Sequence, residues 1–302
     1  MIHTLRHRLP HGIELSCRVS GDPGRPVLVF LHGFPEAAFA WDELLAHFSR
    51  PEHGGYRCVA PHLRGFADSS SPADVAMYRA KHLVQDVCAL ISVEAGTQPL
   101  AALVAHDWGG AVAWSVANQH PGRMARLVIL NSPHPGTFWR ELRHNPAQQA
   151  ASAYMNFLIR PDAEALLSEN NFSRLWGFFA DEGTPDVPPR WLDAAMRERY
   201  LQVWTMGLNG GLNYYRASPL RPARQGDAGA DGVELPASMW RIDVPTLVLW
   251  GMRDRALLPA LLDGLEDQIP RLHVERLAQA SHWLVHEQPG VVTTHIARFL
   301  QS

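Results

Sequence analysis

The stretch LAALVAHDWGG at residues 100–110 constrains the fold more than any other part of this chain. It begins as an apolar run typical of a buried strand, then passes through Asp107 into glycines that open a helical pattern. A strand that turns directly into a helix holds its central residue in a strained conformation, so the flanking residues must be small. Ala105 and Gly109, on either side of Asp107, meet this requirement. The stretch predicts a sharp strand–turn–helix with Asp107 at the turn.

Short apolar runs recur along the chain and predict a mostly parallel sheet buried on both faces. Helical patterns separate the runs, for example the apolar residues at 83, 87, 90 and 91, which share one helix face. Strands that alternate with helices imply βαβ units and therefore an α/β fold. We expect eight strands, at residues 3–8, 12–19, 26–31, 56–60, 100–105, 127–130, 245–250 and 273–277.

The alternation of strands and helices stops between residues 133 and 240. This region is rich in aromatic residues, leucine and arginine, and it predicts helices without strands. Its end, residues 218–237, carries several prolines and glycines and is expected to be a long mobile loop. We therefore expect a core formed by residues 1–132 and 241–302, with a helical lid (residues 133–240) inserted after the sixth strand.

Composition excludes several classes of protein. The 302 residues are 46% hydrophobic and 19% charged, as in globular proteins. The net charge of −3 and the absence of a basic stripe argue against a nucleic-acid partner. No apolar run is long enough for a membrane span, and the N-terminal residues lack the apolar core of a secretory signal. Three widely spaced cysteines favour reduced thiols in a cytoplasmic protein over disulfides or a zinc site.

Asp107 occupies the position of a nucleophile on such a strand–turn–helix elbow. A serine there would attack a carbonyl carbon, whereas a carboxylate suits in-line attack on a saturated carbon and forms an alkyl ester. Water then cleaves the ester at the Asp107 carbonyl carbon. This chemistry suits strained carbon–oxygen rings and carbon–halogen bonds. The alternative interpretation is that Asp107 only caps the following helix.

Two further residues are expected to complete a catalytic triad with Asp107. His282 follows the last predicted strand, at the sheet edge where catalytic groups gather, and can take a proton from water. Asp254 follows the strand at 245–250 and would orient His282. The alternative for Asp254 is an ion pair with Arg253 or Arg255.

The loop after the strand at 26–31 reads HGFP and is expected to face the elbow. The backbone N–H groups of Phe34 and Trp108 would then form an oxyanion hole. His32 is expected to tie this loop down without taking part in the chemistry. The side chains of Phe34 and Trp108 would also line an apolar substrate pocket.

Together these motifs resemble the epoxide hydrolase branch of the α/β-hydrolase superfamily. The resemblance covers nearly the whole chain and is carried by HGFPE at 32–36, RGFADS at 64–69, HDWGG at 106–110, the insert, and Asp254 with His282 and Trp283. It implies an α/β-hydrolase fold and an enzyme that opens a small apolar epoxide to a vicinal diol with water, using no cofactor and no metal. Ala105 departs from the family, which usually has glycine there.

The resemblance also implies two lid tyrosines that hydrogen-bond the epoxide oxygen and donate a proton. A phenol, with a reference pKa of about 10, can do both. NYYR at 213–216 assigns one role to Tyr215, and the other goes to Tyr154. The alternative is that both tyrosines only pack the lid, as we expect for Tyr200 and Tyr214.

Two other functions stay open at this stage. Haloalkane dehalogenases share the HDWGG element, so a haloalkane or haloacid dehalogenase with the same Asp107 nucleophile is the main alternative. Against it, Phe34 stands where those enzymes often carry a halide-binding asparagine, and a fluoroacetate-type enzyme would have arginine in place of Trp108.

In some superfamily members the acid of the triad follows the sixth strand, but residues 131–133 offer no carboxylate, which favours Asp254. A ligand receptor without catalysis is the third reading. A homo-oligomer is compatible with the sequence.

Overall fold

The computed structural model describes residues 1–180 and 188–302, and residues 181–187 of the expected lid lie outside the described residues. Its centre is an eight-stranded sheet with the strand order β1-β2-β4-β3-β5-β6-β7-β8. β2 pairs antiparallel with both β1 and β4, and all the other neighbours are parallel. The strands are β1 (His3–Arg8), β2 (Glu14–Ser20), β3 (Val27–Leu31), β4 (Arg57–Pro61), β5 (Ala102–His106), β6 (Leu127–Leu130), β7 (Thr246–Gly251) and β8 (Leu272–Leu277).

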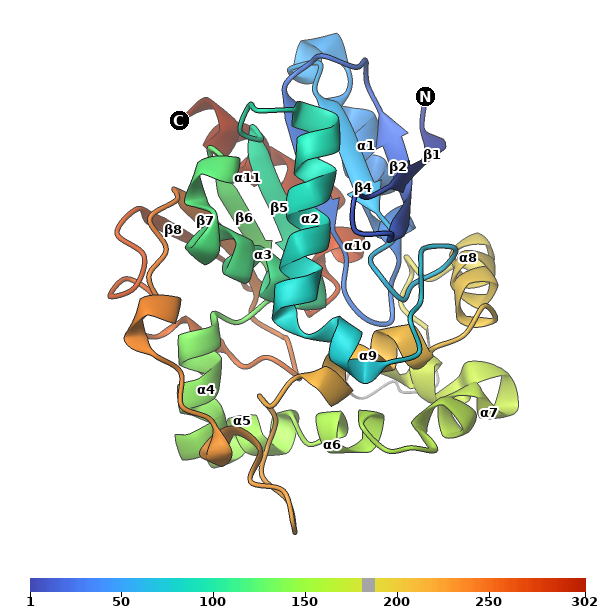
Figure 1. Cartoon of the computed structure of the whole chain (residues 1–302), viewed down its shortest axis with the longest axis vertical. Coiled ribbons are helices and arrows are strands. Elements are labelled where there is room, and N and C mark those ends of the chain that lie inside the picture. The colour runs from blue at the N-terminus through green and yellow to red at the C-terminus, as the bar shows by residue number, and fades with distance from the viewer. Residues whose placement is uncertain (181–187) are drawn as a thin grey trace.

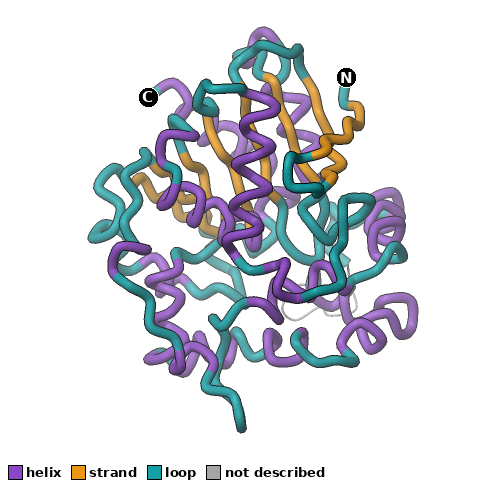
Figure 2. Tube along the Cα trace, in the orientation of Figure 1, coloured by secondary structure: helices purple, strands orange, loops and turns teal. Residues whose placement is uncertain are grey.

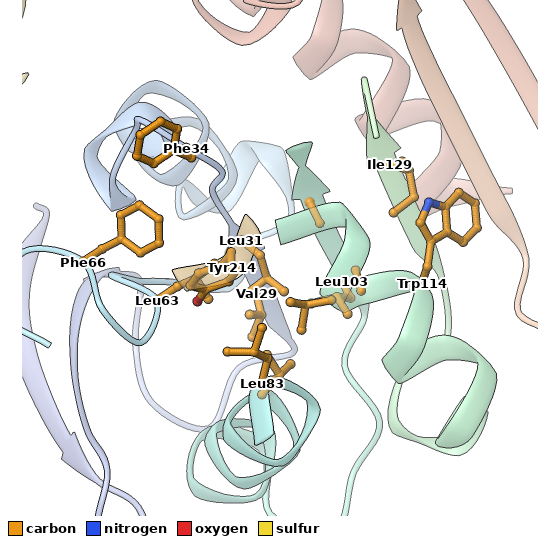
Figure 3. Packing of buried hydrophobic residues seen from close by; sticks show 14 of the residues in the cluster. Val29, Leu31, Phe34, Leu63, Phe66, Leu83, Leu103, Trp114, Ile129 and Tyr214 are labelled. Atoms are coloured by element: carbon orange, nitrogen blue, oxygen red, sulfur yellow. The ribbon is translucent and has the colours of Figure 1, made fainter. Parts of the chain in front are cut away.

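Helices cover both faces of this sheet (Figure 1). In β3, Val27, Val29 and Leu31 belong to one hydrophobic cluster with residues of α2 and α3, while Leu28 and Phe30 belong to a second cluster with residues of α1 and α11. Figure 3 shows part of the first cluster, between the sheet and α2. The core helices are α1 (Asp42–Phe48), α2 (Ala80–Ala95), α3 (Asp107–Gln119), α10 (Leu284–Glu287) and α11 (Pro289–Gln301).

Between β6 and β7 the chain forms an insert of helices and loops, seen below the sheet in Figure 2. No strand occurs in the part of this insert that the structure describes. Residues 218–237, expected as a loop, contain a short 3₁₀ turn at Gly229–Gly232 and an ion pair of 2.7 Å between Arg221 and Asp227. The helices of the insert are α4 (Pro135–His144), α5 (Pro146–Ala151), α6 (Tyr154–Leu158), α7 (Ala163–Trp176), α8 (Ala194–Trp204) and α9 (Asn209–Ala217).

The structure confirms the expected α/β fold, the eight strands and the helical insertion after the sixth strand. The ends of the strands differ from the expected ones by no more than two residues. None of the helices in the described ranges is both long enough and apolar enough to cross a membrane.

Candidate active site

Asp107 lies at the sharp turn between β5 and α3, as the sequence predicts. Its φ of 49° falls in the left-handed region, which is strained for a residue with a side chain. A Cβ on Gly109 would collide with the Leu31 carbonyl group, and one on Gly110 would collide with the side chain of Ser132. The Ser132 hydroxyl donates a hydrogen bond of 2.7 Å to the Asp107 carbonyl oxygen. The turn therefore needs both glycines and is held by the segment that follows β6.

The Asp107 carboxylate points away from its own helix. Its Oδ1 atom accepts a hydrogen bond of 2.8 Å from the Phe34 backbone N–H, and its Oδ2 atom faces His282 Nε2 at 3.8 Å. Within the described residues it makes no hydrogen bond to the first turn of α3. This geometry does not support the interpretation that Asp107 serves as a helix cap.

His282 is held on its other side by Asp254, which is 3% exposed. The His282 Nδ1–H donates to Asp254 Oδ2 over 2.7 Å. The backbone N–H groups of Ala256 and Leu257 donate to Asp254 Oδ1, each over 2.9 Å. Burial alone would raise the pKa of Asp254, but His282 and these donors outweigh it and lower the pKa. The carboxylate therefore stays charged and fixes the ring orientation.

The same arrangement shifts the protonation of His282. Burial would lower the pKa of His282, but the carboxylate of Asp254, with a smaller contribution from Asp107, raises it to about 9.

The alternative expected for Asp254, an ion pair with a neighbouring arginine, does not occur among the described residues. Arg253 contacts the Gln279 side chain instead, and Arg255 contacts the Ala180 carbonyl oxygen.

Asn131 is a site residue that sequence reasoning missed, although it stands at the position where a second acid was looked for. It is fully buried, its Nδ2 donates to Asp254 Oδ2 over 2.5 Å, and its Oδ1 accepts from the Gly251 N–H over 2.7 Å. Its φ of 36° lies in the region that asparagine tolerates better than most residues. Asn131 therefore links the ends of β6 and β7 and completes the set of donors around Asp254.

The loop after β3 approaches the Asp107 side chain closely. A Cβ on Gly33 would collide with the Asp107 carboxylate, so glycine is required there. The His32 ring braces this loop as expected: its Nδ1–H donates to the Gly33 carbonyl over 2.9 Å, and its Nε2 accepts from the Leu63 N–H over 3.0 Å. Burial lowers the pKa of His32 to about 3, which keeps the ring neutral.

Only one of the two expected oxyanion donors contacts the Asp107 carboxylate directly. The Phe34 N–H reaches Asp107 Oδ1, but the Trp108 N–H makes no hydrogen bond to it in the described part of the chain. The Trp108 ring packs edge-on against Tyr214 and Tyr215, with centroids 5.7 Å and 4.9 Å apart. Of the two side chains expected to line an apolar pocket, Phe34 is among the described residues around the cavity and Trp108 is not.

A cavity of about 1520 Å³ separates the core from the insert. Asp107, His282, Tyr154 and Tyr215 all line it, although α6 and α9 bring the two tyrosines from the insert. Other aromatic side chains around the same space are Phe34, Phe178, Phe179 and Trp283. The structure thus brings together the four side chains that the sequence analysis assigned to chemical steps.

The two lid tyrosines are buried phenols. Their ring centroids lie 6.2 Å apart, and burial, followed by nearby ionisable groups that include Asp107, raises both pKa values far above the ordinary value for tyrosine. Tyr154 and Tyr215 therefore keep their protons and can donate hydrogen bonds. Tyr214 points elsewhere, since its hydroxyl donates to the Arg64 carbonyl oxygen over 3.0 Å.

A second buried polar group lies behind Asp254 and His282, and sequence reasoning missed it. Glu36 accepts hydrogen bonds from the Tyr200 hydroxyl at 2.8 Å and from His286 Nε2 at 2.5 Å, and its Oε2 lies 3.2 Å from His106 Nδ1. His106 Nε2 in turn donates to the His282 carbonyl oxygen over 2.9 Å. Tyr200, expected as a packing residue, is therefore also a hydrogen-bond donor, and the group links the insert to the His282 backbone.

The fold and this elbow define a hydrolase built on a mostly parallel sheet, and comparisons with known proteins agree. The family model of the alpha/beta hydrolase fold matches residues 26–289, so the chain belongs to the α/β-hydrolase family. It is 32% identical to the AB hydrolase superfamily protein YfhM of Bacillus subtilis (strain 168), covering 97% of this chain and 96% of the relative.

Other relatives are epoxide hydrolases. Identity to Epoxide hydrolase 3 of Xenopus tropicalis is 32%, over 96% of this chain and 76% of the relative. The crystal structure of Bacillus megaterium epoxide hydrolase with an inhibitor superposes with a TM-score of 0.87 at 30% identity, covering 99% of this chain and 100% of that one. A variant of the same enzyme, complexed with its naphthyloxy-propanediol product, gives a TM-score of 0.85.

Proposed function

We propose that the protein is an epoxide hydrolase that opens an apolar epoxide to a vicinal diol through an ester on Asp107. The observation that carries the proposal is the shared cavity, in which two protonated tyrosines face the same space as Asp107 and His282. Opening an epoxide leaves an alkoxide on the substrate, and that alkoxide needs a proton donor. The relative that holds a diol product supports the same reaction class.

The first step uses the two oxygens of Asp107 differently. The Phe34 N–H holds Oδ1, so Oδ2 is the atom that attacks the epoxide carbon from the rear. A bond forms between Oδ2 and carbon as the carbon–oxygen bond of the ring breaks. Tyr154 and Tyr215 stabilise the ring oxygen, and one of them supplies its proton. The negative charge of Asp107 passes to the tyrosine that gave up its proton, which is left as a tyrosinate, and Asp107 becomes a neutral alkyl ester.

The second step regenerates the enzyme. His282, held by Asp254, takes a proton from water, and the resulting hydroxide attacks the Asp107 carbonyl carbon. The negative charge that develops on Oδ1 is stabilised by the Phe34 N–H. Collapse of this intermediate breaks the bond between the carbonyl carbon and Oδ2, and protonated His282 gives its proton to the departing Oδ2. The second proton of the water returns to the tyrosinate. The diol therefore leaves with Oδ2, and the aspartate keeps the oxygen from water.

Single turnover in heavy-oxygen water tests this proposal. With the best substrate from a panel of aryl, alkyl and fatty-acid epoxides, label should enter the Asp107 carboxylate and be found by mass spectrometry of the peptide that contains it. Label in the diol and none in the enzyme would exclude an ester intermediate. The same panel, extended to haloalkanes and haloacids, separates the alternative: halide release without diol formation would identify a dehalogenase.

Replacing Tyr215 with phenylalanine should slow ring opening by about 10- to 1000-fold, the usual contribution of a general acid. The ring of Tyr215 packs against Phe34 and Trp108, so phenylalanine keeps these contacts and removes only the hydroxyl. Stopped-flow measurement of the alkylation rate provides the comparison. Tyr214→Phe is the matched control, because its hydroxyl binds the Arg64 carbonyl. An unchanged alkylation rate in the Tyr215 variant would remove this residue from the mechanism.

The pH dependence of ester hydrolysis follows from the His282 site. In the resting enzyme the pKa of His282 is raised to about 9, partly by Asp107, and formation of the ester removes that negative charge. The pKa of His282 should therefore fall in the ester, which frees its base form. We expect the hydrolysis rate to rise with pH, then level off above a midpoint that lies below 9. A single-turnover pH series measures it, and a midpoint above 9 would contradict this account.

A further inference from the structure

The loop that carries Phe34 is held from the lid side by a buried hydrogen bond. The indole Nε1–H of Trp204, near the end of α8, donates to the Pro35 carbonyl oxygen over 2.7 Å. Trp204 is only 2% exposed, and Pro35 directly follows Phe34 in the chain. Because a buried donor or acceptor without a partner costs free energy, this bond favours one separation between α8 and the loop.

Two neighbouring side chains of α8 bind the core segment just beyond Pro35. The Tyr200 hydroxyl donates to Glu36 over 2.8 Å, and the Arg199 guanidinium donates to Asp42 over 2.5 Å. The helix is therefore anchored to this core segment at several points. Of these contacts, the one from Trp204 lies nearest in sequence to the Phe34 peptide.

The lid also holds Phe34 by its ring. On α9, a Cβ added to Gly211 would lie 2.7 Å from Phe34 Cδ2 and 3.1 Å from Phe66 Cε1, so the helix packs on these rings with no spare room. Figure 3 shows the two phenylalanines near each other above the sheet. Tyr215 of the same helix meets the Phe34 ring edge-on, with centroids 5.6 Å apart. The insert thus contacts the Phe34 ring directly and holds the Phe34 backbone through the neighbouring Pro35.

We propose that Trp204 is a positioning residue that keeps the Phe34 N–H directed at Asp107 Oδ1. His32 braces the start of the loop through Gly33, and the indole of Trp204 braces its far end. Trp204 acts through Pro35 and touches no reacting atom. This role rests on the proposed function, in which the Phe34 N–H stabilises the charge on Oδ1 during ester hydrolysis.

Loss of the hydrogen bond from Trp204 to Pro35 should affect the two chemical steps differently. During ring opening the negative charge moves off Asp107 to the epoxide oxygen, so a weaker hydrogen bond to Oδ1 does not slow that step. During ester hydrolysis a full negative charge forms on Oδ1, and a displaced donor raises the barrier. A defect confined to Trp204 therefore slows the second step and makes the alkyl-enzyme accumulate.

The test compares Trp204→Phe with Trp176→Phe in the full-length protein. The two tryptophans belong to one aromatic cluster, with ring centroids 4.4 Å apart, and both donate their indole N–H to a carbonyl. The Trp176 N–H goes to Asn171 inside the lid, so its loss does not touch the Phe34 loop. Both variants lose one indole and one hydrogen bond, and only Trp204→Phe releases Pro35.

The first measurement is amide hydrogen exchange at Phe34, which needs no substrate. Exchange should become about fivefold faster or more in Trp204→Phe, as expected for the loss of one supporting hydrogen bond, and should stay at the wild-type rate in Trp176→Phe. Unchanged exchange at Phe34 in Trp204→Phe would overturn the positioning role, whatever the protein does with epoxides.

The second measurement is single-turnover kinetics with styrene oxide or the best epoxide of the panel. In Trp204→Phe, ester hydrolysis should slow by about 5- to 30-fold, while the alkylation rate stays within about twofold of wild type. This slowing lies between the effect expected for the loss of one hydrogen bond and the effect of losing an oxyanion donor altogether. Equal slowing of both steps, or equal effects in Trp176→Phe, would mean a structural role only. If the wild-type protein converts no epoxide, the proposed function fails, and the exchange measurement alone decides the role of Trp204.

Discussion

Replacing His282 with glutamine should stop the reaction at the alkyl-enzyme. Ring opening needs the Asp107 carboxylate and the tyrosines, so it continues, whereas ester hydrolysis loses its base and slows by about 10²–10⁴-fold. Intact-protein mass spectrometry after addition of an epoxide should show one equivalent of substrate mass on the protein. Glutamine suits the site because its side-chain N–H can still donate to the Asp254 carboxylate, which accepts from His282 in the wild type.

The control for this variant is a histidine of the same region that bonds to Glu36 and, among the described residues, makes no hydrogen bond or ion pair with Asp107. His286→Gln removes a ring that donates to Glu36, and it should not accumulate the mass adduct. An adduct on His286→Gln of the same size as on His282→Gln would mean that general disturbance of the region, and not loss of the base, blocks hydrolysis. Rapid turnover by His282→Gln with no adduct would exclude His282 as the base.

Replacing Asp107 with asparagine should abolish turnover and adduct formation together. The amide is a poor nucleophile, and loss of a nucleophile that acts in a catalytic unit typically costs about 10⁴–10⁶-fold in rate. Asparagine is the suitable substitution because it tolerates the left-handed backbone seen at this position, where φ is 49°. Diol formation measured over hours by chromatography gives the sensitivity that such a reduction requires.

The control for Asp107 is an exposed aspartate, for which Asp263→Asn should retain wild-type turnover. Unfolding temperatures of both variants should lie close to that of the wild-type protein. If Asp107→Asn opened epoxides at a tenth of the wild-type rate or faster, direct attack by water would replace the covalent mechanism. Substitution of both Asp107 and His282 should then cause a further loss, since direct attack by water would still use His282 as its base.

The sequence predicted the fold well because the signals were local and repeated. Most strands of the parallel part read as short apolar runs, since both of their faces are buried, whereas the edge strand β8 reads LHVERL and gives a weaker signal. The absence of such runs between residues 133 and 240 marked the insert. The elbow at Asp107 was also predictable, because its small neighbours are dictated by backbone collisions at Gly109 and Gly110. Local sterics leave a clear trace in the sequence.

The residues that sequence reasoning missed act across long separations. Asn131 reaches Asp254, and Trp204 reaches Pro35, through single hydrogen bonds between segments more than 100 residues apart. An asparagine after a strand or a tryptophan in an aromatic lid has no pattern that reveals its partner. The orientation of the Trp108 ring depends in the same way on distant residues, since Tyr214 and Tyr215 pack against it.

The insert leaves the core after β6 and returns before β7, and these two strands are direct neighbours in the sheet. A change in the length or shape of the insert therefore leaves the pairing of β6 with β7 intact. Changes in the insert can therefore alter the lid side of the cavity, and with it the range of molecules that fit. The sheet edge that carries Asp107 is not affected by such changes. Chimaeras that exchange the insert between relatives should keep the same core, provided that the Phe34 loop, which contacts the insert, is exchanged together with it.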